Sequence, residues 1–373
     1  MDKFLKAITP FAVLLALSIL LVLPQIAYAS NGQWIKYSGG SIYGPGVLGP
    51  TPGAWDSAST SSPRVLYDGT AYRMWYDGGN MTGFAGIGYA VSLDGLTWSK
   101  HAGAVLTPGH SGTWDSAAVE VGSVIWNGTL YLMYYRGSNP TTNQAGAIGL
   151  ATSKDGISWT KYPSNPILLG TQLGSDEGYI ASPTVVKLAL SYDLWYTGKN
   201  VTYQKATTYS RILLATSLDG IHWKKWPAPV FSPATDTKAW DSAAVYSPQV
   251  YWNGTTFGLW YTGLGQSLTE PGIGVATSPD GSTWTRSSYN PILSPGPSGA
   301  WDSAGVEQPS VILGRNGYML FYDGLGSSPG ARVGLAQAPQ SPQVYPVPEF
   351  PYGTIVLGVI ACATLSVLRY RRK

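Results

Sequence analysis

Two glutamates are the residues of this 373-residue chain whose type and position best suit catalytic chemistry. Glu120 and Glu307 stand at equivalent positions of a repeated segment, where the other copies carry Ser61, Ala181 and Tyr246. Acid–base chemistry with two carboxyl groups needs two different environments, so that one group is protonated while the other is ionised. Residues that depart from a repeat meet this need better than residues that recur in every copy.

Three further residues break the same repeat close to the glutamates. Asp77 and Asp323 end predicted strands at which two other copies carry threonine, and Arg136 replaces them in the second copy. Arg136 is predicted to hold a carboxylate or a ligand hydroxyl, or alternatively to pair with Glu120. Asp77 is a candidate for a base or nucleophile, as is Asp56.

Asp56 belongs to a set of aspartates that recurs in every copy, nine residues before a valine. The set is Asp56, Asp115, Asp176, Asp241 and Asp302. Because a residue present in every copy usually serves each unit of the fold, we expect these carboxylates to cap a turn. A ring of carboxylates near a central axis is the alternative. Four of them follow a tryptophan, expected to pack between units or to stack on a ligand ring.

A seven-residue motif shows which elements position these residues. The motif, Ser-x-Asp-Gly-x-x-Trp, spans 92–98, 153–159, 217–223 and 278–284, and its aspartates are 61, 64 and 61 residues apart. Asp-Gly between two alternating apolar runs predicts a β-hairpin whose two turn residues have positive φ. Repeats of this length are typical of propellers.

Each repeat unit predicts four short antiparallel strands, which form one propeller blade. Five inner strands share only four Asp-Gly hairpins, and the segment 34–37 resembles the fourth strand of the other units. We therefore predict an all-β, five-bladed β-propeller over residues 30–338, in which this N-terminal strand closes blade five beside 332–336. The loops after the second strands vary in every unit, so their face is the one expected to meet a ligand.

The two ends of the chain predict export and membrane anchoring. Residues 1–29 have the pattern of a signal peptide, with an uncleaved anchor as the alternative. Residues 339–351 form a Pro-rich spacer, 352–368 a predicted transmembrane helix, and 369–373 a basic cytoplasmic tail. The Pro-Glu-Phe segment at 348–350 resembles archaeal C-terminal sorting signals, which implies a sortase-like processing enzyme; an ordinary membrane anchor is the alternative. Both place the propeller at the cell surface.

Composition excludes several classes of function. The end segments hold six of the 23 basic residues and one of the 20 acidic residues, so the middle of the chain carries 17 basic and 19 acidic residues. This balance leaves no basic field for nucleic acid. The single cysteine, Cys362, lies in the C-terminal apolar segment, so no disulfide is expected. No metal cluster or cofactor motif is present. Glycosylation sequons begin at Asn80, Asn127, Asn200 and Asn253.

The repeat as a whole resembles a known superfamily. Its pattern runs from Trp-Asp through Pro-x-Val and Trp-Tyr to Asp-Gly-x-x-Trp and Asn-Pro-Ile-Leu. This pattern resembles the five-bladed propellers of the arabinanase, levansucrase and invertase superfamily, glycoside hydrolase families 43 and 32, over roughly residues 33–338. The resemblance implies a protein that acts on an oligo- or polysaccharide, with one central carboxylate as nucleophile or base and another as general acid.

The resemblance assigns site residues and also exposes a departure. Glu307, in Glu307-Gln308-Pro309, matches the general acid of the family, and Glu120 is its counterpart in the second unit. The usual base, an Asp before Pro, has no acidic match. Its positions carry Ser62, Val121, Ser182, Ser247 and Gln308. Asp56 or Asp77 is the substitute base expected on this interpretation.

Binding residues follow from the same interpretation. The expected substrate-binding residues are Arg136, Asp323, Trp55, Trp114 and Trp301. The missing Asp-Pro pair leaves an alternative open, a non-catalytic carbohydrate- or protein-binding surface module or a surface-layer component.

Overall fold

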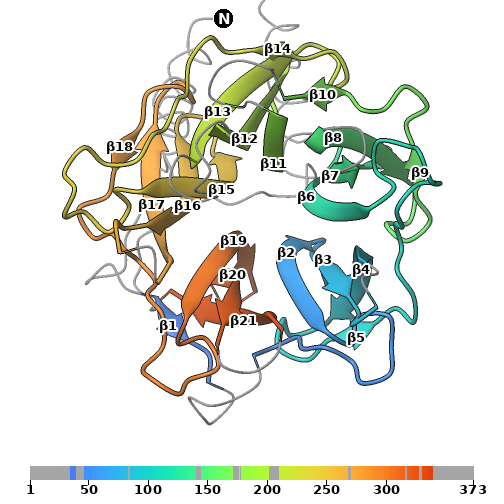
Figure 1. Cartoon of the computed structure of the whole chain (residues 1–373), viewed down its shortest axis with the longest axis horizontal. Coiled ribbons are helices and arrows are strands. Elements are labelled where there is room, and N and C mark those ends of the chain that lie inside the picture. The colour runs from blue at the N-terminus through green and yellow to red at the C-terminus, as the bar shows by residue number, and fades with distance from the viewer. Residues whose placement is uncertain are drawn as a thin grey trace, which may run out of the picture.

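The computed structural model is a ring of five antiparallel sheets around a central axis (Figure 1). It describes residues 34–38, 46–82, 85–139, 144–170, 176, 178–200, 210–267, 270–315, 317–326 and 330–338. Within these ranges no helix is long and apolar enough to cross a membrane. The predicted signal peptide, spacer, transmembrane helix and basic tail lie outside the described residues.

Four blades contain four strands each and blade 2 contains five. The strand named first for each blade lies nearest the centre of the ring (Figure 1). Blade 1 is β2 (Ser59–Tyr67), β3 (Tyr72–Gly79), β4 (Ala85–Ser92) and β5 (Ser99–Lys100). Blade 2 is β6 (Ala118–Trp126), β7 (Tyr131–Asn139), β8 (Gln144–Ser153) and β9 (Thr160–Lys161), with β10 (Leu168–Leu169) also paired to β8. Blade 3 is β11 (Gly178–Lys187), β12 (Tyr192–Asn200), β13 (Ser210–Ser217) and β14 (Lys224–Lys225). Blade 4 is β15 (Ala244–Trp252), β16 (Phe257–Leu264), β17 (Gly272–Ser278) and β18 (Thr285–Arg286).

Blade 5 joins the two ends of the described chain. It is β19 (Gly305–Gly314), β20 (Gly317–Leu325), β21 (Arg332–Gln337) and the N-terminal β1 (Ile35–Lys36). Ile35 lies opposite Gln337 and Lys36 opposite Ala336 in the antiparallel pair β1–β21. The prediction that the N-terminal strand closes blade five is confirmed. Closure also covers the edge of β21, which would otherwise be open to pairing with another chain.

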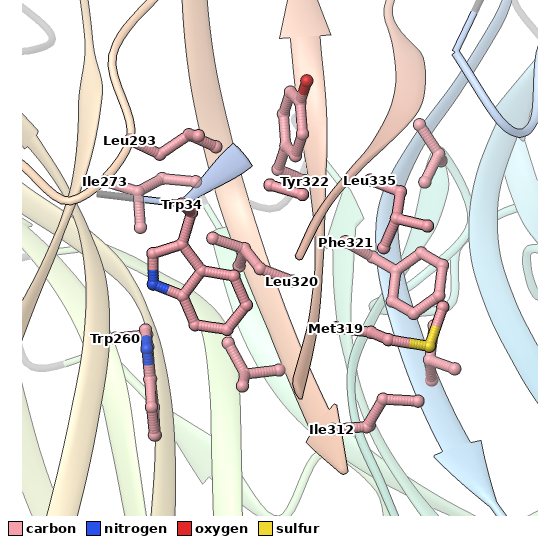
Figure 2. Packing of buried hydrophobic residues seen from close by; sticks show 14 of the residues in the cluster. Trp34, Trp260, Ile273, Leu293, Ile312, Met319, Leu320, Phe321, Tyr322 and Leu335 are labelled. Carbon is pink, nitrogen blue, oxygen red and sulfur yellow. The ribbon is translucent and has the colours of Figure 1, made fainter. Parts of the chain in front are cut away.

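The apolar core lies in the interfaces between neighbouring blades. One buried cluster joins side chains of blades 1 and 2, another joins blades 2 and 3, and a third joins blades 3 and 4. The largest cluster joins blades 4, 5 and 1 and includes Trp34, which is 7% exposed. Figure 2 shows the Trp34 indole next to Trp260 of blade 4 and Leu320 of blade 5. The N-terminal segment therefore contributes core packing as well as strand pairing.

The Asp-Gly turns differ in detail from the predicted hairpin. Gly95 has a φ of +75°, but Asp94 is not among the residues with positive φ. The Oδ1 atom of Asp94 instead accepts the N–H groups of Leu96 and Thr97, each at 2.8 Å, and the Ser92 hydroxyl donates to the same oxygen at 2.8 Å. The prediction of two residues with positive φ is therefore wrong, because side-chain hydrogen bonds stabilise the turn with glycine alone in the left-handed region.

In blades 2, 3 and 4 the same turns bond to the preceding blade. Buried aromatic side chains of the preceding blade donate to the glycine carbonyls of the motif. The bonds are Trp75 Nε1 to Gly156 O at 2.8 Å, Tyr134 Oη to Gly220 O at 3.1 Å and Trp195 Nε1 to Gly281 O at 2.8 Å. The repeated motif is thus an inter-blade contact.

Candidate active site

The inner strands each contain a β-bulge near the central axis, and the backbone geometry at these bulges is unusual. The strand register shifts there, for example between Ser61 and Arg64 in β2. The bulge residues with a left-handed backbone are Ser62 (φ +54°), Ser182 (+48°), Ser247 (+50°) and Gln308 (+54°). A non-glycine residue in this region costs roughly 1–2 kcal/mol, so the surrounding structure must hold it. These are also the positions before proline at which the resembled family carries its aspartate.

A ring of hydrogen bonds from the preceding blade holds these bulges. Each bond runs from a bulge N–H to the residue near the end of the neighbouring second strand. The pairs are Ser62 with both carboxylate oxygens of Asp323 (2.7 and 2.9 Å), Val121 with Asp77 (2.6 Å), Ser247 with Thr197 (2.9 Å) and Gln308 with Thr262 (3.1 Å). Blade 2 carries Arg136 at this position, and arginine has no acceptor. The Arg136 guanidinium pairs with Glu120 on the adjacent strand of its own blade.

A second ring of hydrogen bonds lies further along the inner strands. Its acceptors are Ser310, Ser123, Thr184 and Gln249, which receive the N–H groups of Val65, Val185, Val250 and Val311 respectively. Blade 1 breaks this ring with Arg64, which is 6% exposed and donates to the carbonyls of Pro63 and Gly122. A buried guanidinium needs anionic neighbours. Asp77 and Asp323 lie within its electrostatic reach.

Asp323 is a buried acid and Asp77 a partly buried one, and they lie at the two boundaries of blade 1, with blade 5 and with blade 2 respectively. Burial raises the pKa of Asp77 well above its usual range, and the nearby carboxylate of Glu120 raises it further. Burial likewise raises the pKa of Asp323 despite the bonds from the Ser62 amide, with Glu307 and Asp77 adding to the effect. Both carboxyl groups accept hydrogen bonds from bulge amides, so they stabilise the backbone of the site.

Glu307 has the environment expected of a general acid. It is partly exposed, and burial is the main reason that its pKa is raised. The Tyr246 hydroxyl donates to Glu307 Oε1 at 2.8 Å, and this bond, like the ammonium of Lys199, lowers the pKa in part. Tyr246 occupies the position of blade 4 that corresponds to Glu307 and Glu120 in their own blades. One oxygen of Glu307 is therefore held while the other is left for a ligand.

Two residues that the structure places near Arg136 and Glu307 were not predicted from the sequence. Tyr179 and Lys199 lie opposite each other on β11 and β12. The Arg136 guanidinium carbon lies 4.9 Å from the centre of the Tyr179 ring, and the Lys199 ammonium lies 4.6 Å from it. The available signal was the repeat itself, because the positions of Lys199 in the other blades carry Gly79, Ser138, Leu264 and Leu325.

These residues form one group, here called the central site. It consists of Arg64, Asp77, Glu120, Arg136, Tyr179, Lys199, Tyr246, Glu307 and Asp323. Electrostatic coupling links Lys199 to both Glu120 and Glu307, which belong to blades 2 and 5. Of the predicted site residues, the structure brings together Asp77, Glu120, Arg136, Glu307 and Asp323. The prediction that Arg136 pairs with Glu120 is confirmed.

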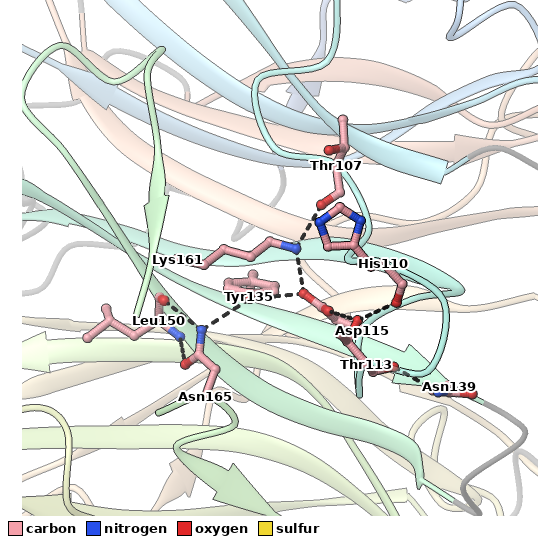
Figure 3. Close-up of polar contacts among 9 residues, drawn as sticks. All are labelled: Thr107, His110, Thr113, Asp115, Tyr135, Asn139, Leu150, Lys161 and Asn165. Carbon is pink, nitrogen blue, oxygen red and sulfur yellow. Dashed lines mark hydrogen bonds and ion pairs between the residues drawn. The ribbon is translucent and has the colours of Figure 1, made fainter. Parts of the chain in front are cut away.

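Asp56 belongs to a structural unit that every blade repeats. Asp56 Oδ2 accepts the Lys100 ammonium at 2.6 Å and the Tyr76 hydroxyl at 3.0 Å. Figure 3 shows the blade 2 equivalent, in which Asp115 binds Lys161 and Tyr135. The corresponding pairs of blades 3, 4 and 5 are Asp176 with Lys225, Asp241 with Arg286 and Asp302 with Lys36. Asp56 is therefore engaged within blade 1, and we leave it out of the central site.

The tryptophans before these aspartates pack in a repeated way too. Trp55, Trp114 and Trp301 lie 6.0, 5.5 and 5.9 Å from the rings of Tyr76, Tyr135 and Tyr322, which in turn bond to the aspartates. A glycine of the second strand makes room for each indole; a Cβ at Gly78 would lie 2.5 Å from Trp55. These contacts lie within single blades, whereas packing between blades was expected, and the central site contains none of the three tryptophans.

No group of three His, Cys, Asp or Glu side chains in the described part of the chain is arranged to hold a metal ion. The chemistry available to the central site is proton transfer and charge stabilisation by its carboxyl, ammonium, guanidinium and phenol groups.

A family comparison shows what part of this propeller is similar to. A model of the glycosyl hydrolases family 32 N-terminal domain matches residues 122–303, which run from the inner strand of blade 2 to the segment that enters blade 5. The chain is a five-bladed propeller that resembles this glycosyl hydrolase domain over just under half of its length.

Individual proteins are also similar to this chain. An uncharacterized protein of Mycobacterium tuberculosis strain H37Rv is 27% identical over 280 residues, covering 73% of this chain and 90% of that protein. A 1,2-beta-oligomannan phosphorylase of Thermoanaerobacter sp. strain X514 is 28% identical over 237 residues, covering 62% and 72%. The crystal structure of a glycosyl hydrolase from Bacteroides ovatus has a TM-score of 0.62 and 19% identity, covering 87% of this chain and 98% of that one. At this identity the structural likeness is one of fold.

Proposed function

We propose that this protein cleaves glycosidic bonds at the central site, with Glu307 as general acid and Glu120 as base or nucleophile. The observation that carries the proposal is the difference between the environments of these two carboxyl groups. Glu307 is bonded to a neutral phenol and has a raised pKa, whereas Glu120 is paired with a guanidinium and its side chain is 40% exposed. Acid–base chemistry with two carboxyl groups needs two such different environments, one for the group that gives a proton and one for its partner.

The two carboxyl groups have separate roles in the proposed reaction. Glu307 gives its proton to the glycosidic oxygen as the bond from that oxygen to the anomeric carbon breaks, which releases the leaving group as an alcohol. Glu120 either takes a proton from a water molecule that attacks the anomeric carbon, or attacks that carbon itself to form a glycosyl ester, which water then hydrolyses while the Glu307 carboxylate takes up the proton of that water. Lys199, which interacts electrostatically with both carboxyl groups, stabilises the negative charge left on Glu307 after its proton has gone.

Carbohydrate as the substrate class is supported by the comparisons. The matching family model is one of glycosyl hydrolases, one relative is named as an oligomannan phosphorylase, and similar structures are glycoside hydrolases. The sugar and linkage are therefore best found with a hydrolysis panel of mannosides, arabinosides and fructosides, followed by product chromatography. Turnover of one class, lost in Glu307→Gln and retained in Glu270→Gln, an exposed glutamate outside the central site, supports the proposal.

A non-catalytic carbohydrate-binding module is the second candidate. The observation that favours it is that none of the left-handed bulge positions described above carries an acidic residue. These positions are occupied by Ser62, Ser182, Ser247 and Gln308. In that case glycan binding would be measurable by titration calorimetry while no member of the hydrolysis panel is turned over. Binding without turnover would therefore replace the enzymatic proposal.

Tyr246→Phe is expected to move the basic limb of the pH profile of kcat/KM to higher pH. The Tyr246 hydroxyl stabilises the ionised form of Glu307, so its loss raises the pKa of Glu307. A general acid works in its protonated form, and this limb reports its pKa in the free enzyme. Tyr289→Phe, a change at an exposed tyrosine, is the control and should leave the profile unchanged. A limb that stays in place or moves to lower pH in Tyr246→Phe contradicts the assignment.

We also propose that the propeller lies outside the cell with its central site directed away from the membrane. The described chain ends at Ala338, whose N–H bonds to Tyr318 O near the start of β20, whereas Asp323 of the central site lies near the end of that strand. The described chain therefore ends on the face of the propeller opposite the central site. Protease added to intact cells should digest the propeller, and truncation after residue 338 should release it from the membrane fraction. Protection of the propeller in intact cells would contradict the proposal.

A further inference from the structure

Two cationic side chains share one aromatic ring at the boundary of blades 2 and 3. Arg136 comes from β7, Lys199 from β12 and Tyr179 from β11, with both cations within 5 Å of the ring centre. Cations gain attraction from a ring face, but two like charges placed around one ring also repel each other. This repulsion contributes to a lowered pKa of Lys199, after burial. The arrangement therefore favours an anion that lies close to both.

The fold alone does not require these three residues. In the other blades, the positions of Tyr179 carry Ser59, Ala118, Ala244 and Gly305. The other second strands carry no cation at the position of Lys199. Gly146 keeps the space beside Arg136 open, because a Cβ there would lie 2.8 Å from Arg136 Nε and 2.5 Å from the carbonyl oxygen of Ile180. The departures from the repeat are thus concentrated in one corner of the central site.

The two cations differ in how far the protein already neutralises them. Arg136 pairs with Glu120. Lys199 is coupled electrostatically to Glu307 and Glu120, but no carboxylate in the described ranges lies within ion-pair distance of its ammonium. Lys199 is partly exposed as a residue, so it can form a charged hydrogen bond with a ligand.

We propose that Arg136, Tyr179 and Lys199 form a subsite for an oxyanion carried by the ligand, either the carboxylate of an acidic sugar or a phosphate. Lys199 binds one oxygen as a point charge, Arg136 adds positive charge beside it while it stays paired with Glu120, and the Tyr179 ring lies against both cations. The inference rests on the proposed function in one respect, since it assumes that the ligand of the central site is a carbohydrate or its reaction partner.

The test measures binding to the full chain by titration calorimetry at constant ionic strength. The probes are galacturonate, inorganic phosphate and the neutral sugar galactose. At least one oxyanion should bind to the wild-type protein more tightly than galactose does. Lys199→Met should weaken that binding by about 10- to 100-fold, the effect of losing one charged hydrogen bond. Lys187→Met, a change on the same blade at an exposed lysine that contacts the Asn127 carbonyl, should leave it unchanged.

The outcomes separate the two ligand sources and the two proposals. Selective binding of galacturonate identifies an acidic sugar, and selective binding of phosphate identifies a phosphate-bearing partner. Equal binding of galactose and both oxyanions, or unchanged oxyanion binding in Lys199→Met, overturns the inference. Lys199→Arg keeps the charge and should retain binding, which separates a lost contact from a misfolded protein. Since no step requires turnover, failure of the hydrolysis panel leaves this result intact.

Discussion

Replacing Glu307 with glutamine is expected to lower kcat/KM by about 10²- to 10⁴-fold, the usual contribution of a general acid. Glutamine keeps the size of the side chain and can still accept the bond from Tyr246, which is 2.8 Å from Glu307 Oε1 in the native protein. The amide has no proton to give to the leaving oxygen. The thermal unfolding midpoint should therefore stay close to that of the native protein while turnover is lost.

The leaving group provides a sharper version of the same test. A 2,4-dinitrophenyl glycoside releases a phenolate that needs no proton, so the Glu307→Gln variant should lose much less activity on it than on a natural glycoside. Glu270→Gln serves as the control and should match the native protein on both substrates. Equal losses on both substrates would show that Glu307 does not act as the proton donor, and unchanged activity on both would refute any catalytic role.

Deletion of residues 30–40 is expected to abolish cooperative folding of the propeller. The deletion removes β1, the buried indole of Trp34 and the 2.6 Å ion pair between Lys36 and Asp302. Loss of a buried tryptophan alone costs roughly 3–5 kcal/mol, and loss of one partner of a buried ion pair costs a similar amount. Together these losses amount to roughly 6–10 kcal/mol, which is comparable with the roughly 5–15 kcal/mol that typically stabilises a domain.

Calorimetric unfolding of the deleted chain is the measurement. Truncation after residue 338 removes no described strand and is the matched control, which should unfold like the full chain. Trp34→Ala is a milder variant that should retain a cooperative transition at a lower midpoint. A near-native transition in the 30–40 deletion would contradict the view that this segment closes the ring.

Much of this fold could be predicted from the sequence because the blades of a propeller repeat one pattern of strands and turns. Four Asp-Gly motifs with one isolated fourth strand at 34–37 determined the number of blades and the way the ring closes. The same comparison between copies marked Glu120, Glu307 and Arg136 as departures. Asp56 could be interpreted in two ways until its contacts with Lys100 and Tyr76 were seen.

The remaining part of the central site depends on spatial proximity that one-dimensional spacing does not reveal. Lys199 precedes a loop that varies in every copy, so its departure from the repeat carried little weight. Only the ring geometry places it within reach of both Glu120 and Glu307, which are 187 positions apart in the chain. The Asp94 turn shows a different limit of prediction from sequence. The motif was recognised, but the backbone conformation of the turn depends on side-chain hydrogen bonds that the motif alone does not reveal.

The two rings of inter-blade hydrogen bonds have a mechanical consequence. Both rings are interrupted by an arginine at a boundary of blade 2, by Arg64 on the side of blade 1 and by Arg136 on the side of blade 3. Blade 2 therefore takes part in fewer of these bonds to backbone N–H groups than blades 4 and 5 do, and Arg64 provides in their place one bond to the Gly122 carbonyl of blade 2. We therefore expect the propeller to deform most easily around blade 2. This blade carries Glu120 and borders Tyr179 and Lys199, so a bulky ligand would be accommodated there at the lowest cost in deformation energy.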